Sequence, residues 1–176
     1  SKDAINAYLQ AYAYLKKHCG SLHLHLTTYF ESLLDNTQLA FDLQTHSVHI
    51  DLVRGEDQLD ACLQAIQDGQ ILSLGLVDGR NIWINNLEQS IEITKKAIQV
   101  LGENRVIVSS SCSLLHSPIS LTNETSLDSE VKTWLAFAEE KLQEISIIAG
   151  AINNNLSEKQ QQILQNNKIA IANKKT

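Results

Sequence analysis

The sequence predicts an α/β fold: half of a TIM-like (β/α)8 barrel, with four parallel strand-helix units preceded by one helix. Short apolar segments alternate four times with amphipathic ones, which is typical of a parallel sheet with right-handed crossovers. The segment 71–77 is apolar on both faces, as expected of a buried parallel strand. A complete barrel needs about 250 residues, so the 176 residues of this chain suit half of one.

The first expected element is a helix over residues 3–18, ahead of the strand-helix units. Asp3 is expected to cap it through its carboxylate, and Gly20 to end it, because glycine tolerates a positive φ. Its apolar side chains recur at helical spacing, at Ala4, Ala7, Tyr8, Ala11, Tyr12 and Leu15.

The first two units lie between residues 22 and 69. Residues 22–28 alternate in polarity and predict a strand, followed by a short helix near 31–39. Residues 48–53 predict the second strand. Asp57 is expected to cap the helix after it, and Gly69 to end that helix.

The next two units have clearer boundaries. After the strand at 71–77, Asn86 and Gln89 resemble a capping box at the start of a helix that Gly102 ends. Residues 105–109 then predict the fourth strand.

One long helix is expected to start near Asp128, because apolar residues recur at steps of three and four. They are Leu127, Val131, Trp134, Ala138, Leu142 and Ile145. We therefore predict two parts: a half barrel over 1–152, and a weakly helical polar tail or linker over 153–176, which is rich in Asn, Gln and Lys.

The composition limits the binding partners and the cellular location that can be expected. The chain has 14 basic and 20 acidic residues and a net charge of -6, so it repels nucleic acid. No apolar run approaches the roughly 20 residues of a membrane span. The three cysteines lack regular spacing, which favours a reducing, cytoplasmic location. The chain has no Met, and we expect a fragment of a longer protein.

Two parallel architectures compete, the barrel and the open doubly wound sheet. No Gly-rich phosphate loop follows the first strand, which weakens the dinucleotide-binding alternative. A free half barrel would expose two edge strands. We therefore expect either the remaining half of the barrel or a self-dimer to cover them.

In a barrel, functional sites gather at the carboxyl ends of the strands. Four polar clusters fall there, at 27–30, 51–54, 78–81 and 109–112, the last with His116 nearby. Arg80, Asn81 and His116 are the candidate substrate-binding residues, because an arginine can clamp a carboxylate or phosphate. The simpler interpretation, which we favour, pairs Arg80 with Asp78 or another local acid.

Histidines and a cysteine suggest two further possibilities. His23 and His25 point to one side of their strand, as His49 and Asp51 do on the next, and such a set can bind zinc. A satisfied polar layer explains them better, because His-x-His alone is a weak pattern. Cys112 has only His116 as a nearby base, so a buried, inert thiol is favoured over a nucleophile or metal ligand.

Four longer segments have a particular sequence, at 26–30, 72–83, 110–118 and 131–138. They resemble segments of the cobalamin-independent methionine synthase family, and the resemblance covers about residues 22–150. It implies a parent chain with two barrels that transfers a methyl group from 5-methyltetrahydrofolate polyglutamate to homocysteine.

The resemblance places this segment in the second half of the amino-terminal barrel. It implies that zinc, the homocysteine site and the catalytic histidine belong to the carboxyl-terminal barrel. No catalytic residue, metal ligand or cofactor is therefore expected in this chain. The expected partners are the remaining half barrel and the catalytic barrel.

The two barrels of the family look like products of duplication. By strand order, Asp51 falls at the place of the zinc-binding Glu and Cys112 at the place of the last zinc-binding Cys, so both are possible relic positions. Thr27 and Thr28 fall near the first ligand pair, and threonine is a poor zinc ligand, so no working zinc site is expected.

Two other functions stay open at this point. The first is a stand-alone module on a half barrel that binds a small anion through Arg80, Asn81 and His116. The second is a decarboxylase of the uroporphyrinogen type, which needs an arginine cluster. Only Arg54, Arg80 and Arg105 are present, which counts against it.

Overall fold

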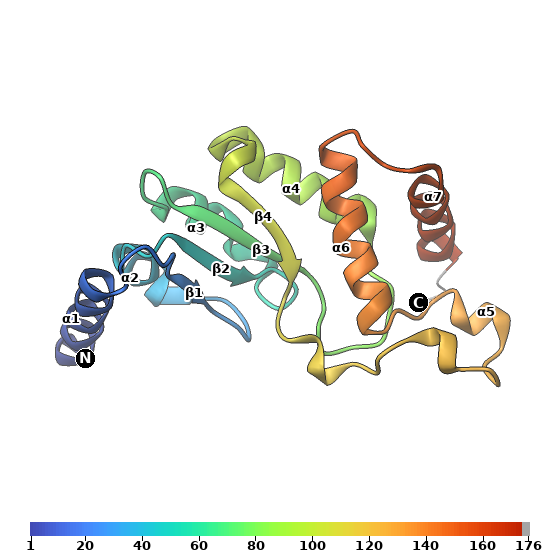
Figure 1. The fold of residues 1–176 in the computed structure, drawn as a ribbon, viewed down its shortest axis with the longest axis horizontal. Coiled ribbons are helices and arrows are strands. Elements are labelled where there is room, and N and C mark those ends of the chain that lie inside the picture. The colour runs from blue at the N-terminus through green and yellow to red at the C-terminus, as the bar shows by residue number, and fades with distance from the viewer. Residues whose placement is uncertain (174–176) are drawn as a thin grey trace. The chain divides into compact units, whose positions relative to one another are not determined.

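The computed structural model describes residues 1–173 (Figure 1) and confirms the predicted α/β fold. Four strands form one parallel sheet in the order β1-β2-β3-β4, and helices alternate with them, as in half of a TIM-like barrel. The strands are β1 His25–Thr27, β2 Ser47–Asp51, β3 Ile71–Val77 and β4 Val106–Ser110. The helices are α1 Lys2–His18, α2 Thr37–Asp42, α3 Leu59–Ala65, α4 Leu87–Leu101, α5 Ser129–Lys132, α6 Ala138–Ile152 and α7 Glu158–Asn173.

The register of the sheet brings polar residues of neighbouring strands together. In the parallel pair β1 and β2, His25 lies opposite Ser47 and Thr27 lies opposite His49. In the parallel pair β2 and β3, His49 lies opposite Ser73. Every residue of β2 is buried, as expected of a strand with a neighbour on each side.

The chain divides into two compact units. The first comprises Ser1–Gly75 and Ala97–Ile107, and the second comprises Leu76–Lys96 and the chain from Val108 onward. The core of the first unit contains the fully buried side chains of Phe41, Val48, Ile50, Leu72 and Leu74. The core of the second contains Val77, Leu87, Ile91, Ile147 and Ile148.

Two of the expected helix caps are wrong. Helix α1 begins at Lys2, so Ser1 is its cap, with Oγ accepting a hydrogen bond from the Ala4 amide at 3.4 Å, and Asp3 lies inside the first turn. Asp57 lies in a 3-10 turn, Glu56–Gln58, ahead of α3. Asn86 does accept from the Gln89 amide at 3.3 Å, and Gly102 follows α4 with φ +84°.

The expected long helix from Asp128 is also wrong, because the chain forms two helices, α5 and α6. Asp128 caps α5, with its carboxylate accepting from the Glu130 amide at 2.8 Å. The backbone between the helices pairs instead with residues 82–84. Ile84 N donates to Trp134 O at 3.0 Å, Ala136 N donates to Ile82 O at 2.8 Å, and Trp83 and Leu135 form an antiparallel bridge.

The polar segment after residue 152 contains a regular helix, α7, which belongs to the second unit. Ile163 and Leu164 pack against the core of that unit. Asn167 is buried, and its side-chain amide donates to Asn85 O at 2.8 Å and accepts from the Leu87 amide at 3.3 Å. Among residues 1–173, no helix is long and apolar enough to cross a membrane.

Replacing Ile148 by Ala should lower the free energy of unfolding by about 2–5 kcal/mol, because it leaves a cavity in the core of the second unit. Leu142→Ala on the same helix should cost under about 0.5 kcal/mol, since Leu142 is 58% exposed. Urea denaturation followed by circular dichroism gives both values. Equal losses in the two variants would contradict the assigned burial of α6.

Candidate functional site

The loop after β3 is held in a tight turn by Asp78. One carboxylate oxygen accepts from the Arg80 amide at 2.7 Å and the other from Asn81 Nδ2 at 2.8 Å. Gly79 packs so closely on the loop after β4 that a Cβ there would lie 2.7 Å from Cys112 O and 2.9 Å from Cys112 Sγ. Only glycine therefore fits at this position.

Ser117 ties the same two loops together. Its hydroxyl lies within hydrogen-bonding distance of Gly79 O at 3.4 Å and Asn81 O at 3.2 Å, the carbonyls on either side of Arg80. Ser117 follows the 3-10 turn Leu114–His116. The side chain of Ser117 thus joins the loop that carries His116 to the backbone of the loop that carries Arg80.

A buried lysine on α6 holds the loop after β3 from behind. Lys141 is fully buried, and its Nζ donates to Asn81 Oδ1 at 3.2 Å and to Trp83 O at 3.0 Å. Burial lowers the pKa of the Lys141 ammonium, while the carboxylates of Glu144 and Asp78 raise it. The ammonium fixes the loop through one side-chain and one main-chain oxygen.

One turn further along α6 lies a buried carboxylate, Glu144, which is 5% exposed. Its Oε1 accepts from the Asn85 amide at 2.8 Å, whereas Oε2 is sealed from solvent and accepts no hydrogen bond from residues 1–173. Burial raises the pKa of Glu144 to about 7. The hydrogen bond from the Asn85 amide and the Lys141 ammonium lower this pKa, whereas the nearby Glu140 raises it. Glu144 therefore takes up a proton close to neutral pH.

The sequence analysis did not single out Lys141 or Glu144. The sequence does contain a pattern that points to them. Lys141 and Glu144 lie between the buried Phe137 and Ile148 at successive intervals of four, three and four residues, and so on one face of the helix. Charged residues on an apolar stripe are rarely fully buried unless they are bonded. A charged residue on such an apolar stripe therefore indicates a buried side chain that needs hydrogen-bonding partners.

The three candidate substrate-binding residues all lie in the second unit, in two different environments. Arg80 and His116 have exposed side chains, on the loops that Ser117 joins. Asn81 is half-buried, and its amide is bonded at both ends, to Asp78 and to Lys141. Its main contribution is to the shape of the loop.

Two histidines of the first unit, His25 and His49, form hydrogen bonds with serines of the neighbouring strands. His25 Nδ1 lies 2.5 Å from Ser47 Oγ, and His49 Nδ1 lies 3.0 Å from Ser73 Oγ. The rings of His25 and His49 are 6.3 Å apart between centroids. Within residues 1–173, no group of three or more His, Cys, Asp or Glu is placed to hold a metal ion.

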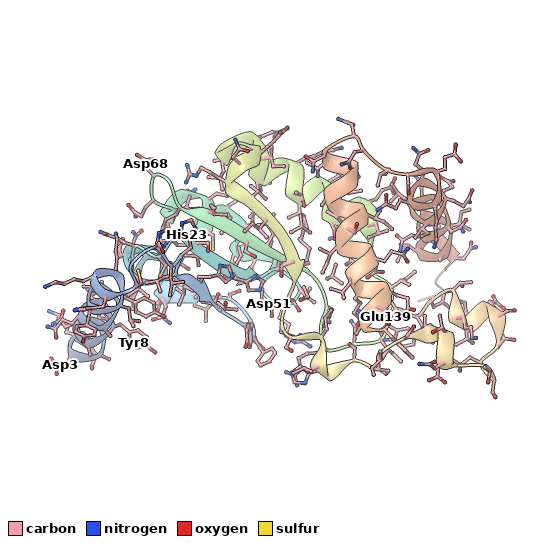
Figure 2. All side chains as sticks on the ribbon, viewed as in Figure 1. Asp3, Tyr8, His23, Asp51, Asp68 and Glu139 are labelled. Carbon is pink, nitrogen blue, oxygen red and sulfur yellow. The ribbon has the colours of Figure 1, made fainter. Side chains whose placement is uncertain are left out.

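The two possible relic positions lie in different units. Asp51, labelled in Figure 2 at the end of β2, is fully buried. Its Oδ1 accepts from the amides of Val53 at 2.9 Å and Arg54 at 3.0 Å, and its Oδ2 accepts from Glu31 N at 3.3 Å. Cys112 is buried in the second unit, with Sγ 3.7 Å from Ser113 O. Asp51 is therefore a poor zinc ligand, because both of its carboxylate oxygens already accept hydrogen bonds from backbone amides.

The raised pKa of Glu144 predicts a pH-dependent stability. A carboxyl whose pKa is higher in the folded than in the unfolded state contributes stability below the unfolded pKa, and this is lost as pH rises through the folded pKa. The change from 4.5 to about 7 corresponds to on the order of 3 kcal/mol.

Urea denaturation between pH 4 and pH 8 of the native chain and Glu144→Gln measures the effect. The native chain should lose stability relative to the variant as the pH rises, while the exposed-site control Glu139→Gln should follow the native chain. If the free energies of unfolding of the native chain and of Glu144→Gln differed by the same amount at every pH in this range, the raised pKa of Glu144 would be refuted.

Comparison with known proteins places the chain in a family. Residues 1–102 match the family model described as the cobalamin-independent synthase, N-terminal domain. A methyltransferase of Parvibaculum lavamentivorans is 46% identical over 143 residues, which are 81% of this chain and 19% of that protein. Another from Saccharomyces cerevisiae is 42% identical over 146 residues, or 83% of this chain and 19% of the relative.

A third relative, from Flavobacterium johnsoniae, is 38% identical over an alignment of 176 positions, which covers 97% of this chain and 23% of the relative. All three are named 5-methyltetrahydropteroyltriglutamate--homocysteine methyltransferase. The chain thus spans about a fifth of the length of the curated relatives that it matches. It belongs to the cobalamin-independent methionine synthase family.

Proposed function

We propose that this chain is a non-catalytic scaffold within a longer zinc-dependent methyltransferase. That enzyme moves a methyl group from 5-methyltetrahydrofolate polyglutamate to homocysteine and so makes methionine. The observation that carries this proposal is the similarity to methyltransferases with that donor and acceptor in their names, over 81% to 97% of the chain. The match to the family's N-terminal domain supports the same placement.

The scaffold role is supported by what the polar side chains at the strand ends contact. Asp51 binds three backbone amides, and Asp78 and Asn81 bind each other. Residues bonded in this way hold loops in place. They are poor candidates for groups that exchange partners during a reaction.

Zinc supports methyl transfer by lowering the pKa of a bound thiol, so that the thiolate attacks the methyl group. This requires a full set of ligands, and residues 1–173 hold no group of three or more candidate ligands placed for a metal. We therefore assign the zinc of the parent enzyme to the part of the longer protein outside this chain.

The remaining half of the barrel and the catalytic barrel are the proposed partners. Strands β1 and β4 end the order of the sheet, so each has an edge for further strands. A reducing cytoplasm fits the cysteines Cys19, Cys62 and Cys112, which are all in the thiol form. Burial raises the pKa of the Cys62 thiol to about 12, which makes this thiol unreactive.

A second candidate function is the capture of a small anion. The observation that favours it is the pair of exposed cationic or ionisable side chains, Arg80 and His116, on loops joined through Ser117. A guanidinium in such a position can bind a carboxylate through two hydrogen bonds.

The denatured mass of the protein in its source cells tests the scaffold proposal first. A fragment role predicts a species about five times heavier than 19.6 kDa, in keeping with the lengths of the relatives. The purified long form should convert homocysteine to methionine with 5-methyltetrahydropteroyltriglutamate, and the 176-residue chain should not. Methionine formed by the 176-residue chain would overturn the scaffold role.

Titration with triglutamate separates the two candidate functions. A scaffold chain should show no saturable change in its amide NMR spectrum. An anion-binding module should show one that Arg80→Ala abolishes and that Lys95→Ala, at an exposed ion pair with Glu92, leaves intact. A saturable change that depends on Arg80 would favour the anion-binding function over the scaffold role.

A further inference from the structure

Helix α1 of the first unit has one apolar and one polar face. Its large apolar side chains recur at intervals of three, four and three residues, which places them on one face of the helix. They are Ile5, Tyr8, Tyr12 and Leu15, and together they form the α1 stripe. The opposite face carries Asp3, Asn6, Gln10 and Lys17. This division is typical of a helix that packs against a core by one face.

The α1 stripe is nevertheless exposed. No residue of α1 is buried. Tyr8, labelled in Figure 2, is 57% exposed, and Leu15 is 46% exposed. At the end of the helix Lys16 Nζ donates to Gln44 Oε1 at 3.1 Å, which is a polar contact and leaves the stripe uncovered. An exposed apolar face of this length indicates a surface that binds another part of a protein.

Helices α2 and α3 of the same unit do bury their apolar faces. Helix α2 buries Ala40 and Phe41, and α3 buries Leu59, Cys62 and Ala65. Each of these helices connects two neighbouring parallel strands, α2 between β1 and β2 and α3 between β2 and β3. Helix α1 precedes β1, which is the first strand of the sheet. A connecting helix with a strand on only one side is therefore the one that is left exposed.

The burial of the sheet falls off toward the same side. Leu26 of β1, Val48 of β2 and Leu72 of β3 lie in one row across the strands, so their side chains point to the same face of the sheet. Val48 and Leu72 are fully buried, whereas Leu26 is half-buried. The layer that covers this face is thus incomplete at β1, where the edge of the sheet is open.

The topology identifies what completes it. The order of the strands in the sheet follows their order in the chain, so each connection moves one strand in the same direction. Right-handed connections of this kind place their helices on one face of the sheet. A helix directly before β1 then lies over β1 and over the strand that precedes the helix.

We propose that the α1 stripe packs against a parallel strand of the longer protein that precedes α1 in the chain and pairs with the free edge of β1. This inference rests on the proposed placement of the chain within a longer protein, whose relatives are about five times its length. A second copy of the chain fits less well. A two-fold axis at the edge would pair β1 with β1 antiparallel, whereas β1 and β2 are parallel, as are β2 and β3.

Photo-crosslinking of the long protein tests which segment covers the stripe. The photoreactive residue p-benzoylphenylalanine replaces Tyr8, and the matched control replaces Gln10 on the polar face. The Tyr8 position should crosslink within the same chain to a peptide in the roughly 20 residues before Ser1, because strands and the loops that follow them are short. The Gln10 position should give no such crosslink. Crosslinking from Tyr8 to a second copy or to a different segment, or no crosslink from Tyr8, would overturn the proposal.

A pair of charged variants of the long protein gives an independent readout. Tyr8→Asp should lower the thermal unfolding midpoint by about 2 °C or more, because it places a carboxylate in an apolar contact. Gln10→Asp carries the same side chain on the polar face and should shift the midpoint by less. Equal shifts in the two variants would contradict the packing of the stripe.

The crosslink and the methyl-transfer assay fail separately. Methionine formation by a long protein whose Tyr8 position crosslinks elsewhere would disprove the packing of α1 and leave the proposed function standing. A Tyr8 crosslink to the preceding strand in a long protein that forms no methionine would do the reverse. A source species of 19.6 kDa would contradict both.

Discussion

The second unit depends on one buried ammonium. Lys141 donates to Asn81 Oδ1 and Trp83 O, and so fixes the segment that leads from β3 to α4. That segment in turn pairs with residues 134–136, which interrupts the helix between α5 and α6. Burying a charge is costly unless hydrogen bonds compensate it, so the fold of this loop and the burial of Lys141 require each other.

The same use of polar groups recurs at the strand ends. The carboxylate oxygens of Asp51 accept hydrogen bonds from the amides of Glu31, Val53 and Arg54. Those of Asp78 accept hydrogen bonds from the Arg80 amide and the Asn81 side chain. The family to which the chain belongs is enzymatic, yet these residues have structural partners. That is the physical basis for regarding this segment as a frame for a site formed elsewhere in the longer protein.

The strands were predictable from the sequence because apolar runs such as 71–77 have one simple interpretation, a buried parallel strand. The break between α5 and α6 was not, because the stripe from Leu127 to Ile145 keeps its helical spacing through it. At the break, the backbone pairs with the distant residues 82–84. Arg80, Asn81 and His116 could be proposed from their position after strands. The helical stripe marks Lys141 and Glu144, but their partners could be found only in the structure, because they lie about 60 residues away along the chain.

The central claim is that this segment contributes no zinc ligand to the longer enzyme. The most direct test is the zinc content per chain and the kcat for methionine formation of the long protein carrying Cys112→Ser. Cys112 is the thiol that strand order places at a ligand position, and here it is buried against Gly79. The account predicts an unchanged zinc content and a kcat within about twofold of the native value, a difference of under 0.5 kcal/mol in the barrier. Loss of one zinc per chain together with loss of activity would contradict it.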